Sequence, residues 1–207
     1  MAAVSHLKVR QLECIRGDRL LFSGLDFELG SGELLHIRGA NGSGKTSLLR
    51  ILCGLSQPES GDIFWQGQPV RHQRIEFLKQ LVYLGHHPGL KEDLTPMENL
   101  RLVTKLHNTR QGVNLEKILS EAGLNRHLDQ PTRSLSAGQR QRIALTRLLL
   151  QEAILWILDE PFTSLDHTGI AWVQHLLEQH LRRGGLVVLT SHQPVEIDAP
   201  VRFLQLG

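Results

Sequence analysis

The chain has 207 residues, of which 41% are hydrophobic and 21% are charged. This composition is typical of a globular protein with a buried core and excludes the disordered, collagen-like and disulfide-scaffold classes. With 23 basic and 21 acidic residues, the formal net charge of +2 is too balanced to indicate nucleic-acid binding by bulk electrostatics. Cys14 and Cys53 lack any metal or heme-attachment spacing, so we expect reduced thiols. No apolar run reaches the roughly 18 residues that a membrane span requires.

The first third of the chain is rich in predicted strands. Apolar alternation between Gly-containing turns predicts strands over 4–12, 20–29, 34–38, 61–65 and 81–84. A helix is expected over 45–53, where four apolar residues precede the stop signal of Gly54.

The pattern changes near Pro88. Capping signals predict helices over about 95–107, 115–123 and 136–150, and no strand pattern interrupts them. Strands are then expected over 154–158 and 186–190 with a helix over 168–182 between them, and 201–206 is expected to be an edge strand. The simplest interpretation is one α/β domain over 1–207, with a core of 1–85 and 151–207 and a helical subdomain of about 86–150.

Segment 39–46 matches the pattern GxxxxGK[ST] in full, and it follows an expected strand and opens an expected helix. Glycines at these positions let backbone N–H groups converge on phosphate oxygens, where the helix dipole also favours negative charge. Lys45 is expected to neutralise the β- and γ-phosphates, and the Thr46 hydroxyl to ligate Mg²⁺. The candidate ATP-binding residues here are Gly39, Ala40, Asn41, Gly42, Ser43, Gly44, Lys45, Thr46 and Ser47.

Two acids, Asp159 and Glu160, end the apolar segment 154–158. Acids after a strand are often ordinary loop residues, but ligands of open α/β sheets bind where parallel strands end. Together with the P-loop, this position predicts that Asp159 holds Mg²⁺ through water and that Glu160 is the general base that polarises the attacking water.

Segment 135–139, LSAGQ, opens an expected helix. One interpretation is a capping box formed by Ser136 and Gln139. The second adds a function: a Ser hydroxyl, a Gly that permits close approach and a free helix N-terminus form another phosphate-binding surface. Its candidate residues are Ser136, Ala137, Gly138 and Gln139. Since the chain holds one P-loop and one such surface, we expect two ATP molecules to be sandwiched in a head-to-tail twofold dimer.

In order and spacing, these motifs, segment 164–166 and His192 resemble the ATPase subunits of ABC transporters over essentially the whole chain. The resemblance implies a P-loop NTPase core of the ABC type, an inserted helical subdomain and a small N-terminal antiparallel β part. It implies that the signature 135–139 binds the γ-phosphate of ATP held by the opposite subunit. It also implies that Asp166 is the D-loop aspartate and that His192 is a switch residue that contacts the γ-phosphate.

Shorter segments are similar to the heme exporter ATP-binding subunits of cytochrome c maturation. They are 21–25, 65–69, 85–89, 156–163 and 190–194. This similarity implies an ATPase that powers heme export or release of a heme-loaded chaperone. It further implies an ATP-dependent homodimer bound to integral-membrane subunits at the cytoplasmic face of the bacterial inner membrane, with neither nucleic acid nor a direct lipid anchor. An ABC transporter for another substrate is the alternative.

Three positions depart from the ABC pattern. Arg16 stands where many members place an aromatic that stacks on adenine, and its guanidinium is either a stacking group or a solvated one. Ala137 replaces the first glycine of the signature. His86, or His87 with a shift of one residue, stands where the family has the Q-loop glutamine, and both histidines could equally be plain loop residues.

Other classes fit the sequence less well. A nucleic-acid or ribosome-associated ABC ATPase usually carries two cassettes or a long coiled-coil insertion, and a small-molecule P-loop kinase has no use for segment 135–139. Direct heme ligation is disfavoured because adjacent His86 and His87 cannot both face one iron, and His175 and His180 lie off a shared helical face.

Overall fold

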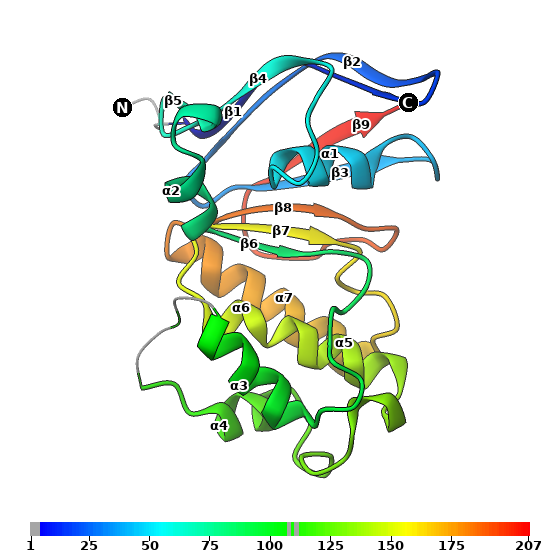
Figure 1. Ribbon diagram of the computed structural model, residues 1–207, viewed down its shortest axis with the longest axis vertical. Helices are drawn as coiled ribbons and strands as arrows, with labels where there is room; N and C mark the ends of the chain where they lie inside the picture. Colours follow the sequence, from blue (N-terminus) through cyan, green and yellow to red (C-terminus); the bar gives the residue numbers. More distant parts are fainter. Residues whose placement is uncertain (1–4, 107–108, 110–111) are drawn as a thin grey trace.

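The computed structural model of the chain describes residues 5–106, 109 and 112–207 (Figure 1). Two sheets form the upper and middle layers of the view. The first is antiparallel, in the order β2-β1-β4-β5, and consists of β1 (Ser5–Arg16), β2 (Arg19–Gly30), β4 (Ser60–Trp65) and β5 (Gln68–Pro69). The second is parallel, in the order β6-β7-β8-β3-β9, and consists of β3 (Leu34–Gly39), β6 (Leu81–Leu84), β7 (Leu155–Asp159), β8 (Leu186–Thr190) and β9 (Val201–Leu206).

The parallel sheet is buried on both faces. Every residue of β7 and β8 is buried. Their nearly continuous apolar sequences are typical of central parallel strands that helices cover on both faces. Helix α1 (Lys45–Leu52) lies between the two sheets in Figure 1, and its Leu48, Leu49 and Leu52 are fully buried. Helix α7 (His167–Arg182) covers the opposite face with Val173 and Leu177.

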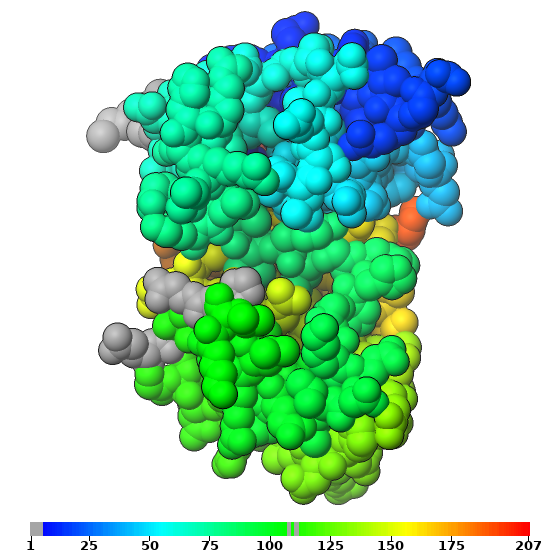
Figure 2. All heavy atoms as spheres, in the orientation of Figure 1, coloured from blue at the N-terminus to red at the C-terminus, as the bar shows by residue number. Residues whose placement is uncertain are grey.

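A separate group of helices lies beyond α7 in Figure 1. It contains α3 (Pro96–Leu106), α4 (Leu115–Glu121), α5 (Ala137–Leu145) and α6 (Arg147–Leu150). Leu100, Leu119, Ile143 and Leu150 share an apolar cluster of their own. The space-filling view shows this part, coloured green to yellow-green, as a lobe next to the two sheets (Figure 2).

Most expected elements are confirmed within a few residues. The strands over 81–84, 186–190 and 201–206 have the predicted bounds, and β9 is an edge strand as expected. Residue 4 of the first expected strand and residue 107 of the first expected helix lie outside the described residues. Both cysteines are free and buried, and burial raises the pKa of each thiol.

One helix differs from its prediction. The helix expected over 136–150 is divided at Thr146 into α5 and α6. The buried Thr146 hydroxyl donates to the carbonyl of Ile143 at 2.6 Å, and the N–H of Leu149 turns to the Thr146 carbonyl three residues back. A Thr side chain that bonds back to its own helix in this way tightens the turn, so the regular ladder ends there.

Short elements complete the chain. They are α2 (Arg74–Lys79) and the single turns η1 (Val70–His72) and η2 (Thr132–Ser134). Within the described ranges, no helix combines the length and the apolar content needed to cross a membrane.

Candidate functional site

The glycine-rich loop joins β3 to α1, and two of its carbonyl oxygens bind the side chain of Lys45. Gly44 begins the helix with φ 98°, a conformation that favours glycine. Gly39 has φ 153°, and a Cβ there would meet the Leu206 carbonyl oxygen at 2.4 Å, so no side chain fits. Lys45 Nζ donates to the carbonyl oxygens of Gly39 and Ala40 at 2.8 and 3.1 Å. The ammonium group is therefore held against the loop at the N-terminus of α1, the end of a helix that favours anions.

Asp159 lies at the end of β7 and joins two other elements. It is 4% exposed. Its Oδ2 accepts a hydrogen bond from Thr46 Oγ1 at 2.9 Å, and its Oδ1 accepts one from Thr190 Oγ1 at 2.7 Å. The first turn of α1, the end of β7 and the end of β8 thus share one carboxylate.

Glu160 follows in a backbone conformation that non-glycine residues rarely adopt, with φ 53°. Its N–H is directed to Thr190, with 3.0 Å to the hydroxyl oxygen and 3.2 Å to the carbonyl oxygen. Its Oε2 accepts from the backbone N–H of His192 at 3.2 Å, and His192 Nε2 lies 3.5 Å from its Oε1. The strained turn is therefore fixed by β8, and the carboxylate faces His192.

These groups line one cavity of about 550 Å³. Arg16 enters it from the end of β1, His86 from the segment after β6, and His192 from the segment after β8. Asp159 and Glu160 line it together with Asn41, Gly42, Gly44, Lys45, Thr46 and Ser47. His87 is not among the residues that line this cavity. The hydroxyl oxygen of Ser43, within the loop, is buried. Five segments far apart in the sequence thus meet where the parallel strands end, the usual place for a ligand in such sheets.

The signature residues lie elsewhere. Ser136, Ala137, Gly138, Gln139 and Asp166 line a second hollow, of about 610 Å³, that shares no residue with the first. The expected capping box is present, because Ser136 Oγ accepts from the Gln139 N–H at 3.2 Å and Gln139 Oε1 accepts from the Ser136 N–H at 2.8 Å. One chain does not bring the P-loop and the signature into one site.

Gly138 and Asp166 shape this second hollow. A Cβ at Gly138 would meet the Ser164 carbonyl oxygen at 2.5 Å, so the signature helix packs directly on that backbone. Asp166 caps α7 by accepting from the Gly169 N–H at 2.8 Å, and it also pairs with Arg142. The Gly169 N–H and then Arg142 hold the pKa of the Asp166 carboxyl below its ordinary value.

The donor set fits a magnesium-bound nucleotide. Thr46 Oγ1 and Asp159 Oδ2 are hard oxygen ligands within 2.9 Å of each other, and oxygen ligands of this kind are what Mg²⁺ prefers. Mg²⁺ usually binds through one or two protein groups plus water and substrate phosphates, which matches one hydroxyl and one carboxylate beside a phosphate-binding loop.

Thr190 was missed by the sequence prediction. Its hydroxyl bonds both Asp159 and the Glu160 N–H, so it aligns the two acids. The available signal was a single polar residue at the end of the apolar strand 186–189.

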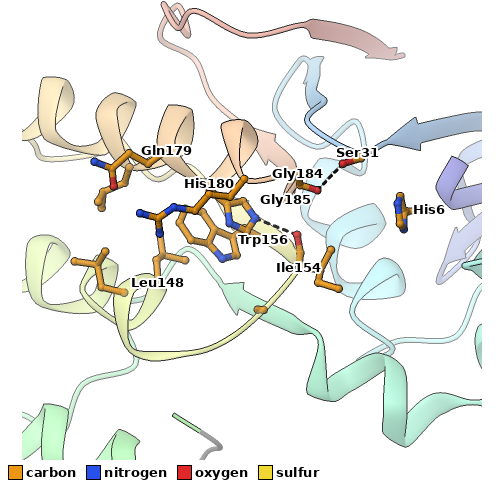
Figure 3. Close-up of a pocket in the computed structure, with 13 residues that line it drawn as sticks. His6, Ser31, Leu148, Ile154, Trp156, Gln179, His180, Gly184 and Gly185 are labelled. Atoms are coloured by element: carbon orange, nitrogen blue, oxygen red, sulfur yellow. Dashed lines mark hydrogen bonds between the residues drawn. The ribbon is translucent and has the colours of Figure 1, made fainter. Parts of the chain in front are cut away.

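A third hollow, of about 310 Å³, lies at the opposite end of the parallel strands, where β7 and β8 begin (Figure 3). The His180 ring stacks on Trp156 with 3.8 Å between ring centroids and an interplanar angle of 7°. His180 Nε2 is also hydrogen-bonded to the Ile154 carbonyl at 3.0 Å, the dashed line in the view. None of the predicted site residues lines this hollow.

A family model described as ABC transporter matches residues 22–163. The chain belongs to the ABC transporter family. It is an ATP-binding subunit with the family's ATPase domain, and ATP is its nucleotide.

Curated relatives extend over almost the full length. The chain is 52% identical over 197 residues to the cytochrome c biogenesis ATP-binding export protein CcmA of Methylococcus capsulatus, which covers 95% of both chains. It is 46% identical over 201 residues to the protein of the same name from Escherichia coli strain CFT073, covering 97% of this chain and 96% of that one. A solved structure titled as the ATP binding subunit of an ABC transporter superposes with a TM-score of 0.85 at 26% identity, covering 98% of this chain and 86% of the other.

Proposed function

We propose that this chain is the ATP-hydrolysing subunit of a membrane export complex in cytochrome c biogenesis, with ATP hydrolysis coupled to heme export or to release of a heme-loaded chaperone. The observation that carries ATP hydrolysis is the meeting of Lys45, Asp159 and Glu160 in one cavity. The pathway rests on the similarity, over nearly the whole chain, to export proteins named for cytochrome c biogenesis.

The residues of the cavity divide the chemistry among them. Lys45 exchanges its two loop carbonyls for β- and γ-phosphate oxygens, so it gives up neutral acceptors for charged ones. Thr46, and Asp159 through water, would hold Mg²⁺, which would neutralise charge at the phosphates when bound. Glu160 orients and polarises the attacking water as general base, and His192 contacts the γ-phosphate beside it.

Two further side chains complete the nucleotide site in this proposal. Arg16 stacks its guanidinium plane on adenine at the mouth of the cavity. His86 takes the place of the Q-loop glutamine and acts through water instead of binding the metal directly, since Mg²⁺ prefers oxygen ligands to imidazole.

The separation of the two hollows supports an ATP-dependent homodimer. In it, Ser136, Gly138 and Gln139 of one copy bind the γ-phosphate of the ATP in the cavity of the other, with Asp166 at the junction. The helical subdomain of about 86–150 carries the signature. Family members of this kind work with membrane subunits, and we place the dimer peripherally on such subunits at the cytoplasmic face of the bacterial inner membrane.

Complementation tests the pathway. In a bacterium whose own subunit is deleted, the wild-type chain should restore covalently bound heme in c-type cytochromes, measured by heme staining, and Glu160→Gln should not. The exposed-residue variant Asp129→Asn is the matched control and should restore it fully. Normal ATP turnover without any restored cytochrome would assign the chain to a transporter of another substrate.

A further inference from the structure

One peptide unit beside the proposed catalytic glutamate is held from two sides. The Ser191 carbonyl oxygen lies 3.0 Å from Nε2 of His36, and the His192 N–H of the same peptide donates to Glu160 Oε2 at 3.2 Å. Because a peptide unit is planar, fixing its carbonyl also fixes the direction of its N–H. The two contacts therefore join His36 to Glu160 through a single rigid group.

His36 is well placed to act as an anchor. It lies in the middle of β3, between β8 and β9 in the parallel sheet, opposite Leu189 on one side and Phe203 on the other. Its side chain is 1% exposed, and its ring packs against Phe203 with 5.7 Å between centroids. A buried ring between two paired strands has little freedom, so its hydrogen bond has a fixed direction.

The chemistry of the contact defines the proton position. A carbonyl oxygen only accepts, so the His36 ring must carry its proton on Nε2 and donate it to Ser191. Burial is the main reason that the pKa of His36 lies below its ordinary value, and it outweighs the Ser191 hydrogen bond and the Glu160 charge, which both raise that pKa. At neutral pH the ring is thus an uncharged donor.

The side chain of Ser191 makes contacts of its own within the turn. The Ser191 side chain is engaged with the backbone of Gln193, since its Oγ lies 2.9 Å from both the N–H and the carbonyl oxygen of that residue. These contacts fold the turn after Ser191 but do not engage the Ser191 carbonyl. The His36 ring contacts that carbonyl directly, from the neighbouring strand β3.

We propose that His36 is a positioning residue for ATP hydrolysis: it orients the Ser191–His192 peptide and, through it, the Glu160 carboxylate and the His192 side chain. The inference rests on the proposed catalytic roles of Glu160 and His192. A donor in this place contributes to the chemical step and not to nucleotide binding, because His36 itself lines no part of the cavity.

Three substitutions at His36 test this, with kcat and KM for MgATP as readouts. His36→Gln keeps an N–H donor at similar reach and should retain kcat within about two-fold. His36→Leu removes the N–H donor. His36→Asn keeps a donor on a side chain that is too short to reach the Ser191 carbonyl oxygen. Both should lose about 10- to 100-fold in kcat with KM nearly unchanged, the size of effect that a small misplacement of a reacting group produces. If His36→Leu does not fold, the ratio of kcat between His36→Gln and His36→Asn tests the proposal instead.

Two controls separate the possible failures. Phe203→Leu keeps an apolar side chain against the His36 ring and leaves the hydrogen bond in place, so kcat should stay within about two-fold of the wild type. In ¹H–¹⁵N spectra, the His192 amide resonance should shift in His36→Leu and return in His36→Gln. Wild-type kcat in His36→Leu, or an equal loss in His36→Gln, would overturn the role of His36 while Glu160→Gln stays inactive. Wild-type turnover in Glu160→Gln would instead overturn the proposed role of Glu160 as general base, on which this inference rests.

Discussion

The Thr46 hydroxyl donates a hydrogen bond of 2.9 Å to the Asp159 carboxylate, although the two residues are 113 positions apart in the sequence. The other oxygen of the same carboxylate accepts from Thr190. A buried acid with a donor on each oxygen has a fixed orientation, so the two groups proposed to hold Mg²⁺ are already aligned.

Asp159→Asn tests this alignment. The amide removes the negative charge and places an N–H₂ group where one of the carboxylate oxygens stood. The Mg²⁺ concentration for half-maximal ATP turnover should rise by about 10- to 100-fold, the usual cost of disturbing a partner around a metal. Titration of turnover with Mg²⁺ measures this, and a curve that overlays the wild type would contradict the assignment of Asp159.

Glu160→Gln tests the general base. The amide keeps an acceptor for the His192 N–H but cannot take a proton, so MgATP should still bind while turnover falls by roughly 10² to 10⁴-fold. The unhydrolysed nucleotide should then hold two copies together. Size-exclusion chromatography should show a dimer in ATP and a monomer in ADP, and wild-type turnover would remove Glu160 from the mechanism.

Gly138→Ala tests the signature surface. The new Cβ would stand 2.5 Å from the Ser164 carbonyl oxygen, so the start of α5 must move away from that backbone. The P-loop cavity shares no residue with this hollow, so ATP binding by one chain should be unchanged. When Gly138→Ala is combined with Glu160→Gln, the ATP-dependent dimer should be lost. A dimer that persists would show that this surface does not bind the second nucleotide.

Substitutions at His86 and His87 distinguish two adjacent histidines. Only His86 of this pair lines the cavity, so only its replacement should alter ATP turnover. His86→Gln supplies the amide that the family has at this position and should keep kcat, whereas His86→Ala should lower kcat by about 10-fold or more. His87→Ala is the control and should match the wild type. Wild-type kcat in His86→Ala would exclude this residue from the nucleotide switch.

Gly185→Ala tests the stability of the fold at the N-terminal end of β8, away from the P-loop cavity. An added Cβ would meet the His180 ring at 2.2 Å, and that ring is fixed by its stacking on Trp156 and its bond to Ile154. The free energy of unfolding should decrease by about 1 to 3 kcal/mol, measured by urea denaturation. KM for ATP should stay at the wild-type value, and an unchanged urea midpoint would show that the ring moves aside freely.

The elements that carry motifs could be predicted because local signals agreed with the fold. The strand ending at Gly39, the glycine turn and the apolar face of α1 all indicate one strand–loop–helix unit. Strands β7 and β8 were recognisable from their apolar sequences alone. The capping box of Ser136 likewise predicted the start of α5, since two reciprocal hydrogen bonds require only local residues.

Features that depend on tertiary contacts could not be predicted in this way. Helix α2 was not expected. It has only six residues, and it is held by the burial of Phe77 and by the hydrogen bond from Arg74 to the Gly54 carbonyl. The break at Thr146 depends on which way one hydroxyl turns. The roles of His36 and Thr190 arise only when β3, β7 and β8 lie side by side, because each acts on a neighbouring strand or the turn that follows it.

The placement of the P-loop cavity and the signature hollow on separate surfaces has a kinetic consequence. In the proposed dimer, a complete site combines the cavity of one copy with the hollow of another, so ATP turnover per chain should increase with the concentration of the isolated subunit until pairing is complete. A membrane partner that holds two copies side by side replaces this bimolecular encounter with an effective concentration on the order of millimolar. On this proposal, dilute and unassembled chains should consume little ATP, and hydrolysis should be confined to the assembled complex.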